Sequence, residues 1–219
     1  MNFSIEFIEK LKDALNGELP GKSAHRQMNP LHLNPNFKKF VPDNETHKTA
    51  VLVLLFPNAD NELCTLFTLR SDTLTNHSGE ISFPGGHLEG NENFVDAALR
   101  ETFEEVGIPS ENINVIGMLS PFYALPSDSC IQPIVAYTNY LDNLKLNPDE
   151  VQEAIIVPIE DLLNPDNLDN KVIEKNGRTI QIPYWKIHPE RPLWGATAMI
   201  MNELLTIIKN IFSTSDIIK

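Results

Sequence analysis

The stretch LRETFEEVGI, residues 99–108, places Glu101, Glu104 and Glu105 within five positions. On a helix, residues three and four positions apart are neighbours, so Glu101 faces both of the other glutamates. Each like-charge contact costs only about 0.2–0.5 kcal/mol when the side chains are solvated. The cluster is therefore either a merely acidic helix face or a set of ligands for Mg²⁺ or Mn²⁺, which prefer oxygen donors.

The helix that carries these acids has ends that can be read from the sequence. Asn91 is a suitable N-cap, Glu92 favours the positive first turn, and Gly107, followed by Pro109, predicts the C-terminus. A buried stripe at three- and four-residue spacing is predicted to consist of Val95, Ala98, Leu99, Thr102 and Val106.

A glycine-rich turn precedes this helix. GEISFPGG, residues 79–86, predicts a short strand that ends at Pro84-Gly85-Gly86. Glycine permits turns and close approaches of the backbone that other residues do not. A strand, a glycine-rich loop and a helix in this order direct the helix acids toward a cleft beside loop carbonyls. A divalent cation there would turn repulsion into coordination, and this favours the metal interpretation.

The remaining pattern predicts an α/β sandwich, because mixed strands have helices before, between and after them. The amphipathic start of the chain predicts a surface helix, and two hairpins are indicated by turn residues between β-branched runs. The expected elements are a helix within 1–22, a polar connector, a hairpin over 49–70, strands at 114–119, 131–137 and 152–158, a hairpin over 171–187 with Asn176-Gly177 at its turn, and a helix over 193–212.

Composition excludes several classes of protein. Of the 219 residues 42% are hydrophobic, enough for a sizeable core, and no apolar run is long enough to cross a bilayer. The net charge of −13 argues against nucleic-acid binding. Cys64 and Cys130 lack metal or disulfide spacing and are interpreted as small core residues. Without a secretion signal, the chain is predicted to be cytoplasmic, with no membrane partner.

The run GHLEGNENFVDAALRETFEEVGI, residues 86–108, resembles the signature box of the Nudix hydrolases. That box has fixed glycines, glutamates and one arginine, which this chain supplies as Gly86, Glu92, Arg100, Glu101, Glu104, Glu105, Gly107 and Ile108. Thr102 departs from the pattern, where an aliphatic residue is usual. The resemblance implies a Nudix-type α/β/α sandwich around a mixed β-sheet. We expect a Nudix domain over residues 46–212, an N-terminal helix and connector over 1–45, and a loose tail over 213–219.

The same resemblance implies a pyrophosphohydrolase that uses Mg²⁺ or Mn²⁺. The metals would be bound chiefly by Glu101 and Glu105, with Glu104 assisting, and these three are the predicted catalytic residues. Glu92 would pair with Arg100 as a structural brace. The general base stays open among Glu101, Glu104 and the downstream Glu153.

The upstream run LFTLRSDTLTNHSGEISFPGG, residues 66–86, resembles the coenzyme A pyrophosphatase branch of that family, with Thr75 as a departure. The matching positions are Thr68, Arg70, Ser71, Leu74, His77, Gly79, Glu80 and Phe83 to Gly86. DEVQEAIIVPIEDLL and RPLWGATAMIMNELL are similar to later segments of the branch. The candidate substrate-binding residues are Arg70, His77, Gly85 and Gly86, and an arginine suits the 3′-phosphate of coenzyme A.

The resemblance implies cleavage of coenzyme A or its thioesters to 4′-phosphopantetheine, or its acyl form, and adenosine 3′,5′-bisphosphate. Two alternatives stay open. One is another pyrophosphate substrate such as ADP-ribose, NADH or a dinucleoside polyphosphate. The other is a non-catalytic ligand sensor, which the intact set of box glutamates disfavours. A homodimer is also left open.

Overall fold

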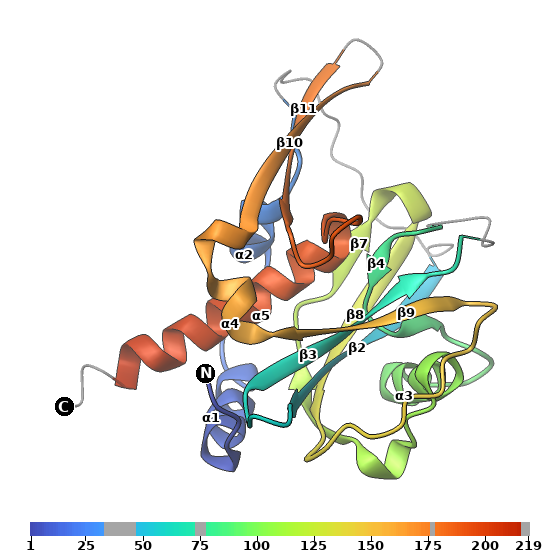
Figure 1. Cartoon of the computed structure of the whole chain (residues 1–219), viewed down its shortest axis with the longest axis vertical. Coiled ribbons are helices and arrows are strands. Elements are labelled where there is room, and N and C mark those ends of the chain that lie inside the picture. The colour runs from blue at the N-terminus through green and yellow to red at the C-terminus, as the bar shows by residue number, and fades with distance from the viewer. Residues whose placement is uncertain (33–46, 73–77, 176–177, 216–219) are drawn as a thin grey trace.

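The computed structural model describes residues 1–32, 47–72, 78–175 and 178–215 (Figure 1). These residues form a mixed eight-stranded β-sheet in which β2 runs parallel to β8 and the other pairs are antiparallel. Its strands are β2 (His47–Pro57), β3 (Leu63–Arg70), β4 (Ile81–Ser82), β5 (Gly85–His87), β6 (Asn114–Met118), β7 (Phe122–Ala124), β8 (Ser129–Tyr137) and β9 (Val151–Pro158).

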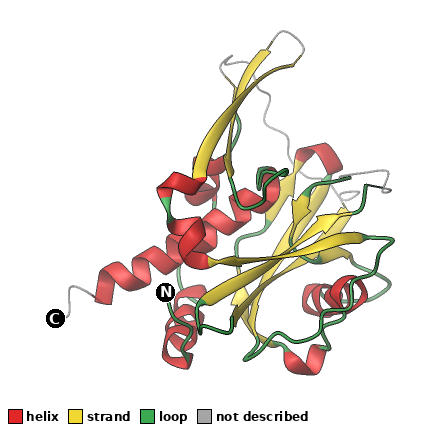
Figure 2. Ribbon diagram, in the orientation of Figure 1, coloured by secondary structure: helices red, strands yellow, loops and turns green. Residues whose placement is uncertain are grey.

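Helices cover both faces of this sheet, as Figures 1 and 2 show. Long helices are α1 (Ile5–Leu15), α3 (Phe94–Val106) and α5 (Gly195–Ser215). Alternate residues of β2 enter two separate cores: Leu52 and Leu54 pack with α3, while Val53 and Leu55 pack with α1 and α5. The predicted α/β/α sandwich around a mixed sheet is confirmed.

The connecting segments include short helical turns. These are α2 (Lys22–His25), α4 (Ile159–Leu163), and the 3₁₀ turns η1 (Arg26–Met28), η2 (Ser110–Asn112), η3 (Leu125–Ser127) and η4 (Pro165–Asn167). No helix within the described ranges is both long and apolar enough to cross a membrane. Cys64 is buried, Cys130 is half-buried, and both are free thiols.

A second, smaller sheet has the order β1-β11-β10, with β1 (Leu31–His32), β10 (Leu168–Lys175) and β11 (Arg178–Trp185). The predicted second hairpin is confirmed by the antiparallel pairing of β10 with β11. Its predicted Asn176-Gly177 turn lies outside the described residues. Figure 1 shows the hairpin extending away from the main sheet.

The two amphipathic helices differ from prediction in detail. Ser4 caps α1 by accepting a hydrogen bond from Phe7 N, and the buried stripe is Phe7, Ile8, Leu11 and Leu15. Ile5, the first residue of α1, is apolar but 49% exposed. In α3 the predicted cap is wrong: Asn93, not Asn91, accepts from Val95 N and Asp96 N, so Glu92 precedes the helix.

The buried face of α3 is also shifted from the predicted stripe. Ala97 and Glu105 are buried, whereas Val95 and Leu99 are only half-buried. Thr102, the departure from the box pattern, is fully buried, and its hydroxyl donates to Ala98 O at 2.7 Å. The polar group is therefore satisfied within the helix while the methyl group packs.

Candidate active site

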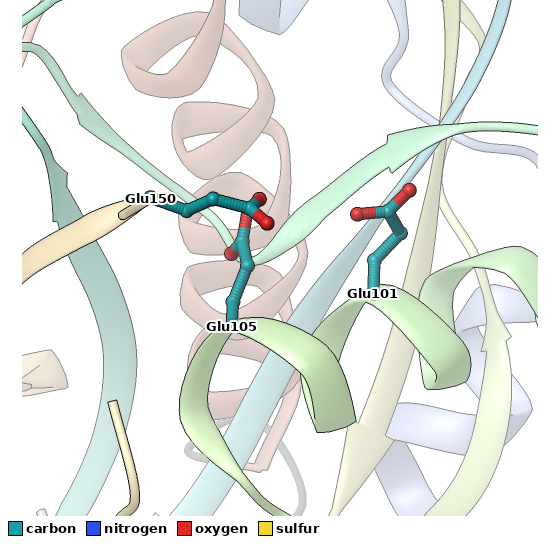
Figure 3. Close-up of side chains that lie close together, drawn as sticks. All are labelled: Glu101, Glu105 and Glu150. Carbon is teal, nitrogen blue, oxygen red and sulfur yellow. The ribbon is translucent and has the colours of Figure 1, made fainter. Parts of the chain in front are cut away.

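The site is formed where the C-terminal half of α3 meets β5, the strand that Gly85 and Gly86 begin. Gly107 ends α3 in the left-handed conformation, with φ of 74°. Glu101 and Glu105 lie one helical turn apart and both point toward the same space (Figure 3). Their spacing of four residues, which causes like-charge repulsion on the helix, also directs both carboxylates to the same place.

A third carboxylate comes from a distant part of the chain. Glu150 lies immediately before β9, in a turn that is tied to two other elements. Asn147 N donates to the backbone oxygen of Glu105 at 2.9 Å, and Ser71 N donates to that of Glu150 at 2.8 Å. The Asn147 amide also donates to Glu150 Oε1 at 3.1 Å. The end of α3 and the end of β3 thus both fix the position of Glu150.

One carboxylate oxygen from each of Glu101, Glu105 and Glu150 lies within 4.8 Å of the others (Figure 3). Glu150 was missed by the sequence analysis, which considered Glu153 instead. Glu153 contacts His188 Nε2 at 3.3 Å through Oε2, and its side chain is half exposed. Glu150 belongs to the segment DEVQEAIIVPIEDLL, which is similar to a later part of the coenzyme A branch, but that similarity did not mark it as a ligand, and it lies just before β9.

The predicted turn at Pro84-Gly85-Gly86 is wrong in part, because Gly85 and Gly86 begin strand β5 and pair with β2; these glycines make room for the first of the carboxylates. Gly86 pairs with Ala50 of β2, and a Cβ atom placed on it would lie 2.3 Å from Glu101 Oε1. Gly85 has φ of 151°, and a Cβ there would lie 2.3 Å from the Ala50 carbonyl oxygen. Both predicted glycines therefore lie beside the carboxylates, where any side chain would displace Glu101 or separate β5 from β2.

Burial gives the cluster unusual electrostatics. Burial is the main cause that raises the pKa of Glu105 to about 8, and the neighbouring Glu101 and Glu150 raise it further. Arg70 opposes this shift from 3.8 Å away, measured from Nη1 to Glu105 Oε1, as does the Gly85 N–H. Burial also raises the pKa of Glu101, against the lowering effect of Arg100.

Two buried polar atoms here have no hydrogen-bond partner within the described ranges: Glu105 Oε2 and Arg70 Nε. An unpaired buried group costs about 1–3 kcal/mol, so such groups are normally satisfied by something. A divalent cation on the three carboxylates and an anionic group on Arg70 would satisfy both. The donor set, consisting only of carboxylate oxygens, suits Mg²⁺ or Mn²⁺.

Arg100 holds the outer side of the cluster. Its guanidinium donates to both oxygens of Glu92 at 2.8 and 3.1 Å, to Glu101 Oε1 at 3.1 Å and to the His87 carbonyl at 3.0 Å. This is the geometry expected of a brace. Glu104 accepts from the same guanidinium at 3.0 Å, its side chain is 47% exposed, and it lies outside the three-carboxylate cluster. The predicted role of Glu104 as a metal ligand therefore has no support from the geometry.

The rim beyond Arg70 carries a second arginine that the sequence analysis did not single out. Arg191 Nη2 lies 3.5 Å from Asp72 Oδ1, and its backbone N–H donates to His188 Nδ1. A Cβ on Gly79 would lie 3.1 Å from the Arg191 guanidinium carbon, and Gly79 N donates to Arg70 O. Arg191 is therefore next to the segment that carries Arg70. His77, the remaining predicted substrate contact, lies outside the described residues.

A family model for the NUDIX domain matches residues 46–176. The chain belongs to the Nudix family. This family hydrolyses small pyrophosphate-containing molecules and generally uses divalent metal ions, so the chain is a Nudix hydrolase. The family assignment agrees with the position of Glu101 and Glu105 on α3, inside the matched range.

Individual relatives extend the comparison. Nudix hydrolase 3 of Caenorhabditis elegans is 27% identical over 226 residues, which cover 95% of this chain and 94% of the relative. The peroxisomal coenzyme A diphosphatase NUDT7 of Mus musculus is 35% identical over 134 residues, 61% of this chain and 56% of the relative. The crystal structure of a MutT/nudix family protein from Enterococcus faecalis superposes with a TM-score of 0.50 at 17% identity, over 95% of this chain and 76% of that one. The last comparison supports the fold alone.

Proposed function

We propose that this Nudix hydrolase cleaves coenzyme A or its thioesters, with Mg²⁺ or Mn²⁺, to 4′-phosphopantetheine, or its acyl form, and adenosine 3′,5′-bisphosphate. The observation that carries the reaction type is the cluster of Glu101, Glu105 and Glu150 with the Arg70 guanidinium beside it. The substrate assignment is supported by the similarity to a coenzyme A diphosphatase and by the Thr68, Arg70 and Ser71 pattern at the end of β3.

The three clustered glutamates are the residues that would hold the cation. When bound, such an ion neutralises charge on the pyrophosphate oxygens, orients them and acidifies a coordinated water. Arg100 holds Glu101 in position through a hydrogen bond to Oε1, while its pairing with Glu92 keeps the guanidinium fixed. Of the three bases considered from the sequence, Glu101 alone lies in the cluster; Glu104 pairs with Arg100 at its exposed side, and Glu153 contacts His188.

Arg70 is suited to the scissile pyrophosphate rather than to a distant part of the substrate. Its side chain is largely buried, it faces Glu105, and its Nε–H has no described acceptor. A guanidinium in this position donates to phosphate oxygens that lie against the carboxylate-bound cation.

Arg191 is suited to the 3′-phosphate, the group that distinguishes coenzyme A from ADP-ribose and NADH. Its side chain is 42% exposed, and its carboxylate neighbour Asp72 is more exposed and 3.5 Å away. Such a surface pair stabilises the fold by at most about 1 kcal/mol, so exchanging Asp72 for a dianionic phosphate costs little. Arg191 lies beside Gly79, whose N–H donates to the backbone carbonyl of Arg70, so both arginines lie near the same backbone contact.

The experiment is a chromatographic product assay with coenzyme A, 3′-dephospho-coenzyme A and ADP-ribose, each with Mg²⁺ and with Mn²⁺. We expect adenosine 3′,5′-bisphosphate from coenzyme A, abolished by EDTA and reduced at least a thousandfold by Glu105→Gln. Glu104→Gln is the matched control, and we expect it to retain most activity. Turnover of ADP-ribose in preference to coenzyme A would keep the Nudix chemistry and refute the substrate. No turnover of any pyrophosphate would favour the sensor alternative.

The same assay tests Arg191. Arg191→Gln is expected to raise KM for coenzyme A about tenfold, corresponding to the loss of a charge-assisted contact of roughly 1.4 kcal/mol, with kcat unchanged. For 3′-dephospho-coenzyme A the same variant should change KM less than about twofold. An equal effect on both substrates would show that Arg191 does not contact the 3′-phosphate.

A further inference from the structure

The outer edge of β10 has no strand partner among the described residues. In the described part of the chain β10 pairs with β11 alone, and residues 168–172 are all exposed. Two of them are apolar: the exposed fractions are 42% for Leu168 and 61% for Val172. An exposed edge with apolar side chains is a template for pairing with another strand, and proteins usually blunt such an edge.

The register of the hairpin identifies which backbone groups point outward. The backbone N–H and C=O of Trp185 are both hydrogen-bonded to Leu193. Leu168, which lies opposite Trp185, is therefore not hydrogen-bonded to it. Two residues further along, Asn170 is opposed to Pro183, which has no N–H, and Asn170 N donates at 2.7 Å to its neighbour Asp169 Oδ1.

Hydrogen-bonded pairs alternate with non-hydrogen-bonded pairs along an antiparallel ladder. Because Leu168 and Asn170 both belong to pairs that are not bonded to β11, the N–H and C=O groups of Leu168, Asn170 and Val172 face the open edge. Lys186 N donates to Asn167 O at 2.8 Å, which places Asn167 in a bonded pair and fits the same alternation.

This edge is complementary to itself about Asn170. If a second copy pairs antiparallel with Asn170 opposite Asn170, then Leu168 lies opposite Val172 of the second copy, and Asp169 lies opposite Lys171 of the second copy. Twofold symmetry produces each of these contacts twice, two apolar pairs and two pairs of opposite charge. Centring the pairing on Lys171 instead would oppose like charges.

We propose that β10 is a homodimerisation edge, through which two copies of this chain join their hairpins into one continuous antiparallel sheet centred on Asn170. The outward N–H of Asn170 exchanges its bond to Asp169 for the carbonyl of the second copy. The Asp169 carboxylate, whose other oxygen lies 3.9 Å from Lys186 Nζ and accepts from Tyr184 at 3.5 Å, then also faces Lys171 of the second copy. The pairing region spans only residues 168–172, so we expect a weak dimer that dissociates in the micromolar range. This inference does not depend on the substrate.

Exchanging the charges at Asp169 and Lys171 tests the proposal. The oligomeric state is measured by sedimentation velocity at protein concentrations from about 1 to about 200 µM. Wild type should shift from monomer to dimer over this range. Asp169→Lys and Lys171→Asp should each stay monomeric, because each opposes like charges twice. An equimolar mixture of the two variants should dimerise, because every facing pair in the mixed dimer has opposite charges. The double variant Asp169→Lys, Lys171→Asp should dimerise as wild type does.

A backbone variant tests the edge independently of charge. Val172→Pro removes a donor that faces outward and should abolish the dimer while leaving the unfolding midpoint of the monomer nearly unchanged. Val172→Ala, the matched control, keeps the donor and should weaken dimerisation less. A wild type that is monomeric throughout, a dimer that persists in Val172→Pro, or single-charge variants that fail to associate when mixed would each overturn the proposal.

Discussion

The buried carboxyl of Glu105 should make the metal-free protein lose stability as pH rises. Its ordinary pKa is 4.5 and its folded pKa is about 8. Between these values the unfolded chain has released this proton while the folded chain retains it, so the unfolded state binds fewer protons and the free energy of unfolding falls with pH. The loss begins near the lower value and is complete above the higher one.

The magnitude follows from the size of the shift. Each pKa unit corresponds to about 1.4 kcal/mol, so the full effect is roughly 5 kcal/mol for this side chain, which is 2% exposed. Between about pH 5.5 and about pH 7.5 the free energy of unfolding of the wild type should fall by about 3 kcal/mol more than that of Glu105→Gln, which mimics the protonated form. Urea unfolding in EDTA at several pH values measures the difference.

Glu104→Gln is the control for this measurement, because that carboxylate is half exposed and pairs with Arg100. Its pH dependence should follow that of the wild type. The other carboxyl groups are the same in wild type and Glu105→Gln, so their contributions to the pH dependence of stability largely cancel in the comparison. Parallel pH profiles for wild type and Glu105→Gln would refute the reasoning, since they would show that Glu105 ionises in the folded protein at its ordinary pKa.

The remaining predictions concern the metal ligands and the glycine-rich turn. Glu150→Gln should weaken Mn²⁺ binding, measured by calorimetry, at least tenfold, whereas Glu104→Gln should change it less than about threefold. Gly86→Ala should reduce activity at least a hundredfold, because its Cβ would lie 2.3 Å from Glu101 Oε1, while the folded structure persists by circular dichroism. Gly17→Ala, where the nearest atom would be 3.4 Å away, should leave activity unchanged; activity lost equally in both would contradict the steric explanation.

The elements that the sequence predicts well are those fixed by local patterns. The β2–β3 hairpin follows from two β-branched runs around a turn, and the end of α3 follows from Gly107. The position of the cap was wrong because two asparagines are close together, and only the backbone shows that Asn93 reaches Val95 N. Local patterns place an element, but they do not choose between adjacent equivalent caps.

The site residues show the same difference between what local patterns predict and what tertiary packing decides. Glu104 and Glu105 are equivalent by helical spacing, since both neighbour Glu101, and only the packing of α3 on the sheet makes Glu105 buried and Glu104 exposed. Glu150 lies 45 positions beyond Glu105 in the sequence, and it reaches the cluster because a turn joins it to the backbone of Glu105. Such proximity depends on tertiary structure, so a motif within one helix cannot contain it.

Bringing three carboxylates together is electrostatically unfavourable, and groups from several elements offset the repulsion. Arg100 neutralises the outer side, and Arg70 and the Gly85 N–H favour the charged form of Glu105, but burial outweighs them and raises the pKa of that carboxyl to about 8. A metal ion must therefore displace a proton from Glu105, which makes cation binding stronger as pH rises. The instability of the metal-free protein at high pH and its affinity for the cation are thus two consequences of the same buried carboxyl.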